Sequence, residues 1–101
     1  MATSSVPLGD VATRLVFEND RVKVWEMLLE PGQASDRHEH TMDYLLCIVE
    51  GTSIDADTDA GSVTIPVTPG TVLYAQRGSV ETAINRSATR FREILIELKD
   101  G

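Results

Sequence analysis

The stretch that decides the fold covers residues 32–51 and reads GQASDRHEHTMDYLLCIVEG. It contains both histidines of the chain, His38 and His40, with one residue between them. Side chains two residues apart on a β-strand point to the same face of the sheet, so both imidazoles can converge on one ion. A His-x-His triplet on a surface strand is also often solvated. The spacing alone therefore leaves a metal site and a solvated strand as alternatives.

Outward from this segment, the chain is a series of short strands. From residue 13 onward, runs rich in Val, Ile and Leu are separated at short intervals by Gly, Pro, Asn and Asp. This pattern is typical of an all-β sandwich or barrel, and no segment predicts a helix. The expected strands cover residues 14–17, 21–29, 37–40, 43–49, 52–57, 62–67, 71–75, 80–85 and 91–98.

Several connections between these strands have turn chemistry. Asn19 can accept Asx hydrogen bonds, Gly61 offers a positive φ for a hairpin, and the Pro-Gly pair at residues 69–70 presets a turn. Pro66 has no N–H to donate to a neighbouring strand, so we expect its strand at a sheet edge or with a bulge.

The length of 101 residues allows one compact domain. The first twelve residues are mostly small and polar, so residues 1–12 are expected to form an arm that lies loosely over the body, without a chemical role. Residues 13–101 are expected to form the single barrel domain. Cys47 is the only cysteine, which excludes an internal disulfide, and we expect it to be a small buried hydrophobic residue.

Composition argues against several classes of partner. Nine Lys and Arg against sixteen Asp and Glu give a net charge of −7, and the basic residues form no patch that could neutralise phosphates. Nucleic acid is therefore not an expected partner. No apolar run approaches the length of about 20 residues that spans a bilayer, and no signal peptide is recognisable. We expect a cytoplasmic protein with no membrane partner.

Several of the expected strands are apolar on both faces or nearly so, including those within residues 44–49 and 94–98. One face of each strand fills the barrel, and the other face needs a second layer to cover it. In a chain this small, we expect a homodimer in which sheet packs against sheet. A monomer with one sheet curled over the other is the alternative.

The spacing within residues 32–51 resembles the first motif of the cupins, G-x5-H-x-H-x3,4-E-x6-G. Gly32, His38, His40 and Gly51 match this motif. Tyr44 stands where the family usually has a glutamate ligand.

A second segment, further along the chain, is similar to the second cupin motif, G-x5-P-x-G-x2-H-x3-N. Gly70, Gly78 and Asn85 match, whereas Gln76 replaces the proline and Glu81 replaces the histidine. The two motifs together cover just over half of the chain. The chain resembles the small single-domain cupins, and this resemblance implies an all-β, jelly-roll-like, double-stranded β-barrel.

Cupin metal sites commonly use three histidines and one glutamate, so the resemblance implies that His38 and His40 are metal ligands. With Glu81 in the place of the third histidine, the set becomes two imidazoles and one carboxylate. Such a set is associated with iron(II) and is acceptable to manganese, nickel or zinc. Glu81 could instead be a solvated charge near the rim, because the alternation of residues 80–85 does not settle which face looks inward.

Two residues close to the histidines are candidate catalytic residues. The neutral phenol of Tyr44 is a poor metal ligand, so Tyr44 either donates a hydrogen bond to a bound substrate or fills the barrel throat. Asp43 supplies a carboxylate to the ion if the turn after His40 is one residue tighter than in the family. Whichever of Asp43 and Glu81 stays off the metal is a candidate general base, if burial raises its pKa toward neutrality.

Cupins include dioxygenases, isomerases, lyases, storage proteins and sugar-binding domains, so the resemblance does not fix the reaction. The leading hypothesis is a metal-dependent enzyme that acts on a small oxygen-bearing organic molecule by dioxygenase or by lyase or isomerase chemistry. The alternative is a metal-free or vestigially metallated module that binds a small ligand without catalysis. Bound metal on the purified protein would separate the two.

Overall fold

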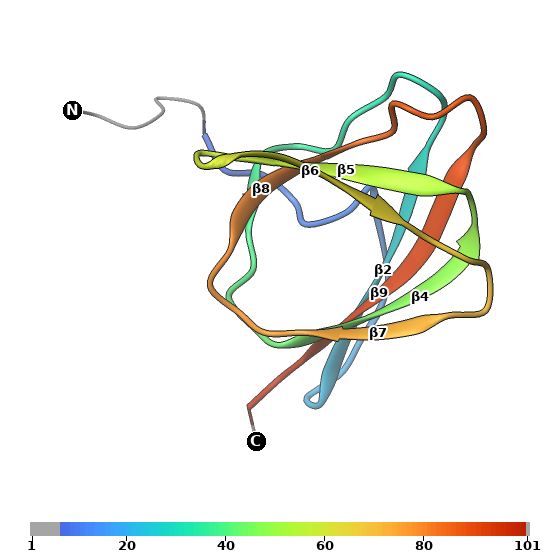
Figure 1. The fold of residues 1–101 in the computed structure, drawn as a ribbon. Coiled ribbons are helices and arrows are strands. Elements are labelled where there is room, and N and C mark those ends of the chain that lie inside the picture. The colour runs from blue at the N-terminus through green and yellow to red at the C-terminus, as the bar shows by residue number, and fades with distance from the viewer. Residues whose placement is uncertain (1–6, 101) are drawn as a thin grey trace.

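Residues 7–100, which a computed structural model describes, form nine β-strands and no helix (Figure 1). No helix in this part of the chain could therefore cross a membrane. The strands lie within two residues of their expected bounds. They are β1 (Arg14–Glu18), β2 (Val22–Leu29), β3 (His38–Glu39), β4 (Tyr44–Glu50), β5 (Ser53–Thr58), β6 (Gly61–Pro66), β7 (Val72–Ala75), β8 (Val80–Ile84) and β9 (Phe91–Leu98).

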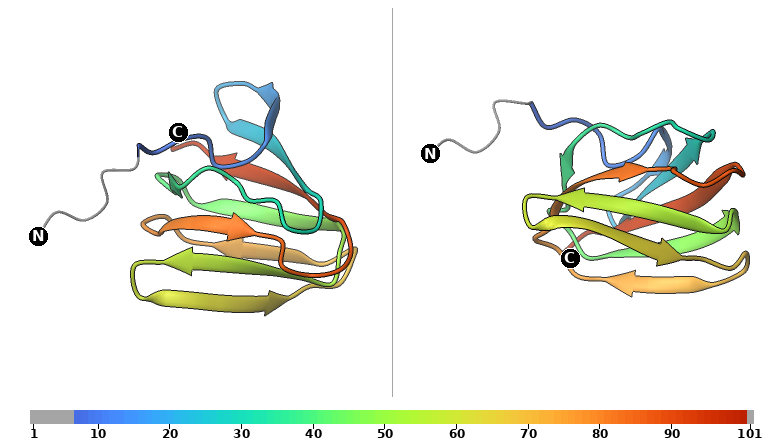
Figure 2. Two further views of the ribbon diagram at one scale, coloured as in Figure 1. Left: turned by 90° about the horizontal axis from the view of Figure 1, so that it is seen from above. Right: turned by 45° about the horizontal axis from the view of Figure 1, so that its top comes forward.

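The strands make two antiparallel sheets that face each other (Figure 2). One sheet has the order β1-β2-β9-β4-β7, and the other has the order β3-β8-β5-β6. Neighbours in each sheet often come from distant parts of the sequence, as when β9 lies between β2 and β4. The expected all-β, double-stranded β-barrel is confirmed.

The interior between the sheets is filled mainly by the inward-facing side chains of β2, β4, β5, β8 and β9. Along β9 every second residue is buried, beginning with Phe91, so the odd-numbered side chains point inward. The buried apolar side chains come from both sheets, and burying a large one contributes about 1.5–3 kcal/mol. They include Trp25, Met27, Leu29, Tyr44, Ile48, Ile54, Phe91 and Leu95.

The expected turns are present with the expected chemistry. The Asn19 side chain accepts hydrogen bonds from the backbone N–H groups of Arg21 and Val22 at 2.8 and 2.9 Å. Gly61 has a φ of 125°, in the region that favours glycine. Pro66 is the last residue of β6, an edge strand, where its missing N–H leaves no central ladder incomplete.

The N-terminal segment departs from the expected loose arm. Val11 and Ala12 are buried in the core, and the backbone N–H of Gly9 donates to the carbonyl of Arg37 at 2.8 Å. Burial of these two apolar side chains away from water holds this end of the arm against the barrel. The backbone hydrogen bond of Gly9 also holds it there. The expectation is therefore wrong for residues 9–12, and residues 1–6 lie outside the described part of the chain.

The outer face of the five-stranded sheet is mostly apolar, and its charged residues Glu26 and Arg92 pair with each other. Its edge strands expose Phe17 on β1 and Val72 on β7, at 52% and 60% of their surfaces. Cys47 lies half-buried on this outer face, since Leu46 and Ile48 on either side of it are the inward residues of β4. It is therefore not the fully buried residue that the sequence predicted. The homodimer expected from this face stays a prediction.

Candidate metal centre

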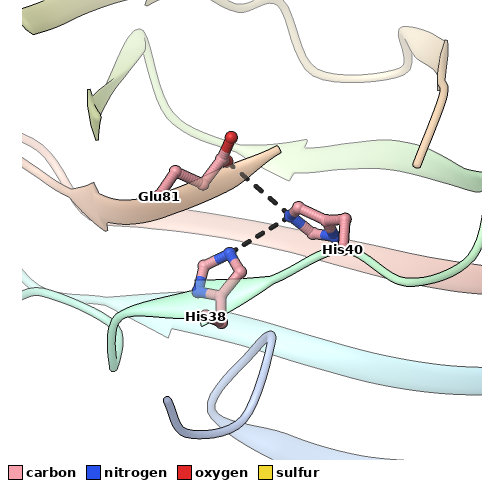
Figure 3. A group of neighbouring side chains, drawn as sticks. All are labelled: His38, His40 and Glu81. Carbon is pink, nitrogen blue, oxygen red and sulfur yellow. Dashed lines mark hydrogen bonds and ion pairs between the residues drawn. The ribbon is translucent and has the colours of Figure 1, made fainter. Parts of the chain in front are cut away.

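His38, His40 and Glu81 come together through the pairing of β3 with β8 (Figure 3). His38 is the first residue of β3 and lies directly opposite Glu81 on β8. His40 follows β3, and its backbone N–H donates to the carbonyl of Ser79 at 2.9 Å. Both histidines are almost fully buried, at 1% and 2% exposure, so neither is a solvated surface residue.

The distances between the donor atoms suit one metal ion. The two Nε2 atoms of His38 and His40 are 3.1 Å apart, and His40 Nε2 is 3.7 Å from Glu81 Oε2. The three donor atoms all lie within 4.8 Å of one another. Metal–nitrogen and metal–oxygen bonds of about 2.0–2.2 Å allow two ligands of one ion to be at most about 4.2 Å apart. Both measured separations meet this limit.

His38 is oriented for ligation by its second ring nitrogen. Nδ1 lies 2.8 Å from the backbone carbonyl oxygen of Asp36, which assigns the proton to Nδ1 and leaves the lone pair of Nε2 directed at the cluster. Burial lowers the pKa of His38, so the ring is neutral at neutral pH. His40 Nδ1 has no hydrogen-bond partner among the described residues.

Glu81 supplies the oxygen donor of the cluster. Its contact with His40 lowers its pKa more than burial raises it, so the carboxyl is ionised at neutral pH. At 3.7 Å that contact is too long for a hydrogen bond, and we regard it as electrostatic. The side chain is 21% exposed and turned toward the histidines, which answers the question that the alternation of β8 left open.

The ring of Tyr44 packs against the imidazole of His40. The two rings stack with centroids 3.9 Å apart and planes 14° from parallel. Burial, with a smaller effect of the charge on Glu81, raises the pKa of Tyr44 to about 12, so the phenol keeps its proton. Tyr44 also lines the cavity, where its expected hydrogen bond to a substrate stays a prediction.

Asp43 is not part of the cluster. Its carboxylate accepts a hydrogen bond from the Tyr74 hydroxyl at 2.8 Å, and bonds from the backbone N–H and Nε of Arg77 at 3.0 and 3.1 Å. These bonds, led by the Arg77 backbone N–H, lower the pKa of Asp43 to about 2. The structure therefore turns Asp43 away from the histidines. The expectation that burial raises the pKa toward neutrality is therefore wrong for both Asp43 and Glu81, since the pKa of each is lowered.

A cavity between the sheets opens beside the cluster. It offers about 50 Å³ to the centres of water molecules, and most of its lining is apolar. The lining residues are Val11, Met27, His38, His40, Tyr44, Leu46, Ile54, Asp55, Ala56, Ile65, Glu81, Ala83, Glu93 and Leu95.

Glu93 is the cavity residue that the sequence interpretation missed. It is 6% exposed, and burial, reinforced by the charge on Glu81, raises its pKa to about 8. A signal was present in the sequence. Residues 91–98 alternate strongly, and Glu93 falls in the same register as Phe91 and Leu95, two large apolar residues that belong in a core.

Comparison with solved structures places the fold among known proteins. The chain is similar to a cupin domain from Bordetella pertussis Tohama I, with 31% sequence identity, a TM-score of 0.79, and coverage of 91% of this chain and 100% of that one. A cupin superfamily protein from Desulfitobacterium hafniense shares 20% identity, with a TM-score of 0.66 and coverage of 96% and 84% of the two chains.

An RmlC-like cupin from Methanocaldococcus jannaschii with a double-stranded β-helix fold shares 14% identity, with a TM-score of 0.68 and coverage of 98% and 93%. No protein-family model and no curated protein matches this sequence. The Bordetella similarity spans nearly the whole chain, and both cupin motifs lie in the strands and turns that build the cavity. The chain belongs to the cupin superfamily.

Proposed function

We propose that this protein is a metal-dependent enzyme that acts on a small oxygen-bearing organic molecule. The observation that carries the proposal is the convergence of His38, His40 and Glu81 on one wall of a cavity. Structural metal sites are normally closed by four protein ligands, whereas catalytic sites keep a position free. Three ligands beside a cavity fit the second kind.

Two residues of the cluster, His38 and Glu81, have the charge states that a divalent ion needs. Neutral His38 offers a lone pair, and Glu81 offers a negative charge. Stacking of Tyr44 on His40 fixes the plane of that imidazole. A bound divalent ion would supply Lewis acidity toward a substrate oxygen, or a site for dioxygen. The donor set suits iron(II), manganese, nickel or zinc.

The cavity limits the size of the substrate. The cavity leaves only about 50 Å³ open to the centres of water molecules, so it is small. Such a space suits a hydroxy acid, a diketone or a small phenol better than a sugar nucleotide or a peptide. Apolar side chains along the rest of the lining exclude water from around the substrate and strengthen electrostatic interactions there.

The reaction class is decided by reconstitution. The metal-free protein is loaded separately with iron(II), manganese(II), nickel(II) and zinc(II), and each form is screened against small hydroxy acids, diketones and phenols with and without oxygen. Turnover only with iron and oxygen identifies a dioxygenase, and turnover with redox-inert zinc identifies lyase or isomerase chemistry. Tight binding of one compound to the metal-free protein, with no turnover by any metal form, contradicts the proposal in favour of a binding module.

A cytoplasmic location, expected from the sequence, stays a prediction.

A further inference from the structure

Glu93 is a second polar feature of the cavity, separate from the cluster of His38, His40 and Glu81. It lies on β9, in the sheet opposite the strands that carry His38 and Glu81, and it lines the same cavity. It is not among the groups whose donor atoms lie within 4.8 Å of one another. Its carboxyl therefore faces the cavity without belonging to the ligand set.

The carboxyl of Glu93 has no partner within residues 7–100. No hydrogen bond or ion pair contributes to its pKa, which burial and the charge of Glu81 raise. Among the described residues, His40 Nδ1 is the only fully buried side-chain nitrogen or oxygen without a hydrogen-bond partner. The Glu93 oxygens also lack a partner, so they are not fully buried and must reach the open space of the cavity.

Two other buried acids show what a structural role looks like in this barrel. Glu97, on the same strand and face, is 3% exposed, accepts a hydrogen bond from Trp25 Nε1 at 2.7 Å, and does not line the cavity. Asp55 lines the cavity, but its carboxylate is paired with Arg86 at 2.9 Å. Both are satisfied inside the protein, and Glu93 is not.

An unpaired carboxyl in apolar surroundings destabilises a fold, and a residue that violates the packing rules in this way is expected at functional sites. In the metal-free protein, burial raises the pKa of Glu93 to about 8, so at neutral pH the carboxyl keeps its proton and can both donate and accept a hydrogen bond. An uncharged carboxyl is suited to a hydroxyl or a carbonyl.

We propose that Glu93 is a substrate-binding residue, which hydrogen-bonds an uncharged hydroxyl or carbonyl group on the end of the substrate remote from the His38–His40–Glu81 cluster. The inference rests on the proposed function, because it assumes that the other end of the substrate binds at the metal. It narrows the substrate to a compact molecule with oxygen at both ends and an apolar body. A second carboxylate is disfavoured there, since the cavity lining is largely apolar and contains no Lys or Arg to pair with it.

The test uses hydroxamates, whose head group chelates zinc. Zinc-loaded protein is titrated by calorimetry with acetohydroxamate, propanohydroxamate and butanohydroxamate, and with the three analogues in which the terminal methyl carries a hydroxyl. The same titrations are made with Glu93→Leu, Glu93→Gln and Glu97→Gln, after circular dichroism has confirmed that each variant is folded. Glu97→Gln is the matched control, because Glu97 shares the strand, face and burial of Glu93 but not the cavity.

In the wild type, at least one hydroxyl-bearing probe is expected to bind about three- to tenfold more tightly than its methyl counterpart, as one buried hydrogen bond provides. The preference should vanish in Glu93→Leu, and should persist in Glu93→Gln and Glu97→Gln. A probe ending in a carboxylate should bind more weakly than the methyl probe of the same length.

The inference is overturned if no hydroxyl probe is preferred, if the preference survives in Glu93→Leu, or if Glu93→Gln loses it as fully as Glu93→Leu. If the wild type binds none of zinc, iron(II), manganese(II) and nickel(II), the proposed function fails on its own. The same probes are then titrated into metal-free protein, where the presence or absence of a Glu93-dependent hydroxyl preference still decides the inference.

Discussion

Glu93 keeps a carboxyl where an apolar side chain would be more stable, and this has a consequence for the dependence of stability on pH. In the unfolded chain its pKa is near 4.5, whereas in the folded, metal-free protein it is about 8. Between these values the folded state keeps a proton that the unfolded state releases. The contribution of Glu93 to the free energy of unfolding therefore falls as pH rises from about 4.5 to about 8.

Glu93→Gln removes this titration. We predict that the free energy of unfolding of the variant, relative to the metal-free wild type, increases between pH 5.5 and pH 8.5 by on the order of 3 kcal/mol. Urea unfolding at several pH values measures it. The other titratable groups that line the cavity, namely His38, His40, Tyr44, Asp55 and Glu81, are common to both proteins, so the difference isolates Glu93. A difference that does not change with pH would show that Glu93 is not held protonated.

Tyr44 supports His40 by stacking, and this role can be separated from its hydroxyl. Tyr44→Phe keeps the ring, so zinc affinity should stay within about twofold of the wild type. Tyr44→Ala releases the imidazole, and affinity should fall by about 10- to 100-fold, as for other residues that orient a ligand. Competition with a chelator measures both. Equal affinities in Tyr44→Ala and wild type would mean that the stacking does not position His40.

At the scale of the strand, the site depends on short segments joined by constrained turns. Gly51, which ends the first motif, has a φ of 131°, and a Cβ there would lie 3.0 Å from Phe91 Cδ1 and 3.3 Å from Phe91 Cα. Phe91 begins β9 and is 1% exposed, so it has little room to move. The sequence motif thus requires glycine here for both backbone and packing reasons.

We predict that Gly51→Ala lowers the free energy of unfolding by about 2–4 kcal/mol. Gly70→Ala is the matched control, because its φ of 91° carries the backbone strain while no atom lies within 4 Å of the added Cβ. Gly70→Ala should lower the free energy of unfolding by about 1–2 kcal/mol. Thermal unfolding measures both. A loss no greater than the control's would mean that Phe91 yields to the added methyl group.

The strands and two of the three candidate ligands could be predicted from local sequence, because each depends on neighbours along the chain. The i, i+2 spacing puts His38 and His40 on one face, and Asn19 carries its own turn chemistry. The direction of Glu81 and the isolation of Asp43 depend on contacts between distant strands. The hydrogen bonds from Tyr74 and Arg77 that hold Asp43 away span more than thirty residues, and no local pattern contains them.

The buried position of Glu93 could be predicted from the sequence, but its lack of a hydrogen-bond partner could not. Alternation placed it on the inner face of its strand, yet nothing in residues 91–98 shows that it lacks a partner while Glu97 has one. The buried Val11 was missed for a related reason. Its neighbours in sequence are polar or small, and the apolar surface that covers it is supplied by the barrel.

At the scale of the whole molecule, the mostly apolar outer face of the five-stranded sheet would be more stable if it packed against another surface. β9 runs through the middle of this sheet, and Ile94 and Ile96 alternate with its inward residues, so they lie on the outer face. The sheet also exposes apolar side chains at both edges, on β1 and β7. A second copy would supply a matching surface by two-fold symmetry.

We predict a homodimer in solution at micromolar concentration, measured by size-exclusion chromatography with light scattering. Ile96→Lys, at the centre of the outer face, should give a monomer because it would bury an unpaired charge in the interface. Val63→Lys, on β6 of the other sheet and 58% exposed, is the control and should stay dimeric. A monomeric wild type, or a dimer broken only by Val63→Lys, would contradict this arrangement.

The central claim is that His38, His40 and Glu81 hold a divalent metal ion, and metal content tests it most directly. Protein stripped of metal, then equilibrated with zinc(II), manganese(II), nickel(II) or iron(II) and desalted, is analysed for metal per chain. The wild type and Glu39→Gln, whose side chain is exposed beside the site, should retain about one ion of at least one metal. Glu81→Gln should bind more weakly, and the folded double variant His38→Ala/His40→Ala should retain none. A wild type that retains no metal, or a double variant that retains as much as the wild type, would contradict the account.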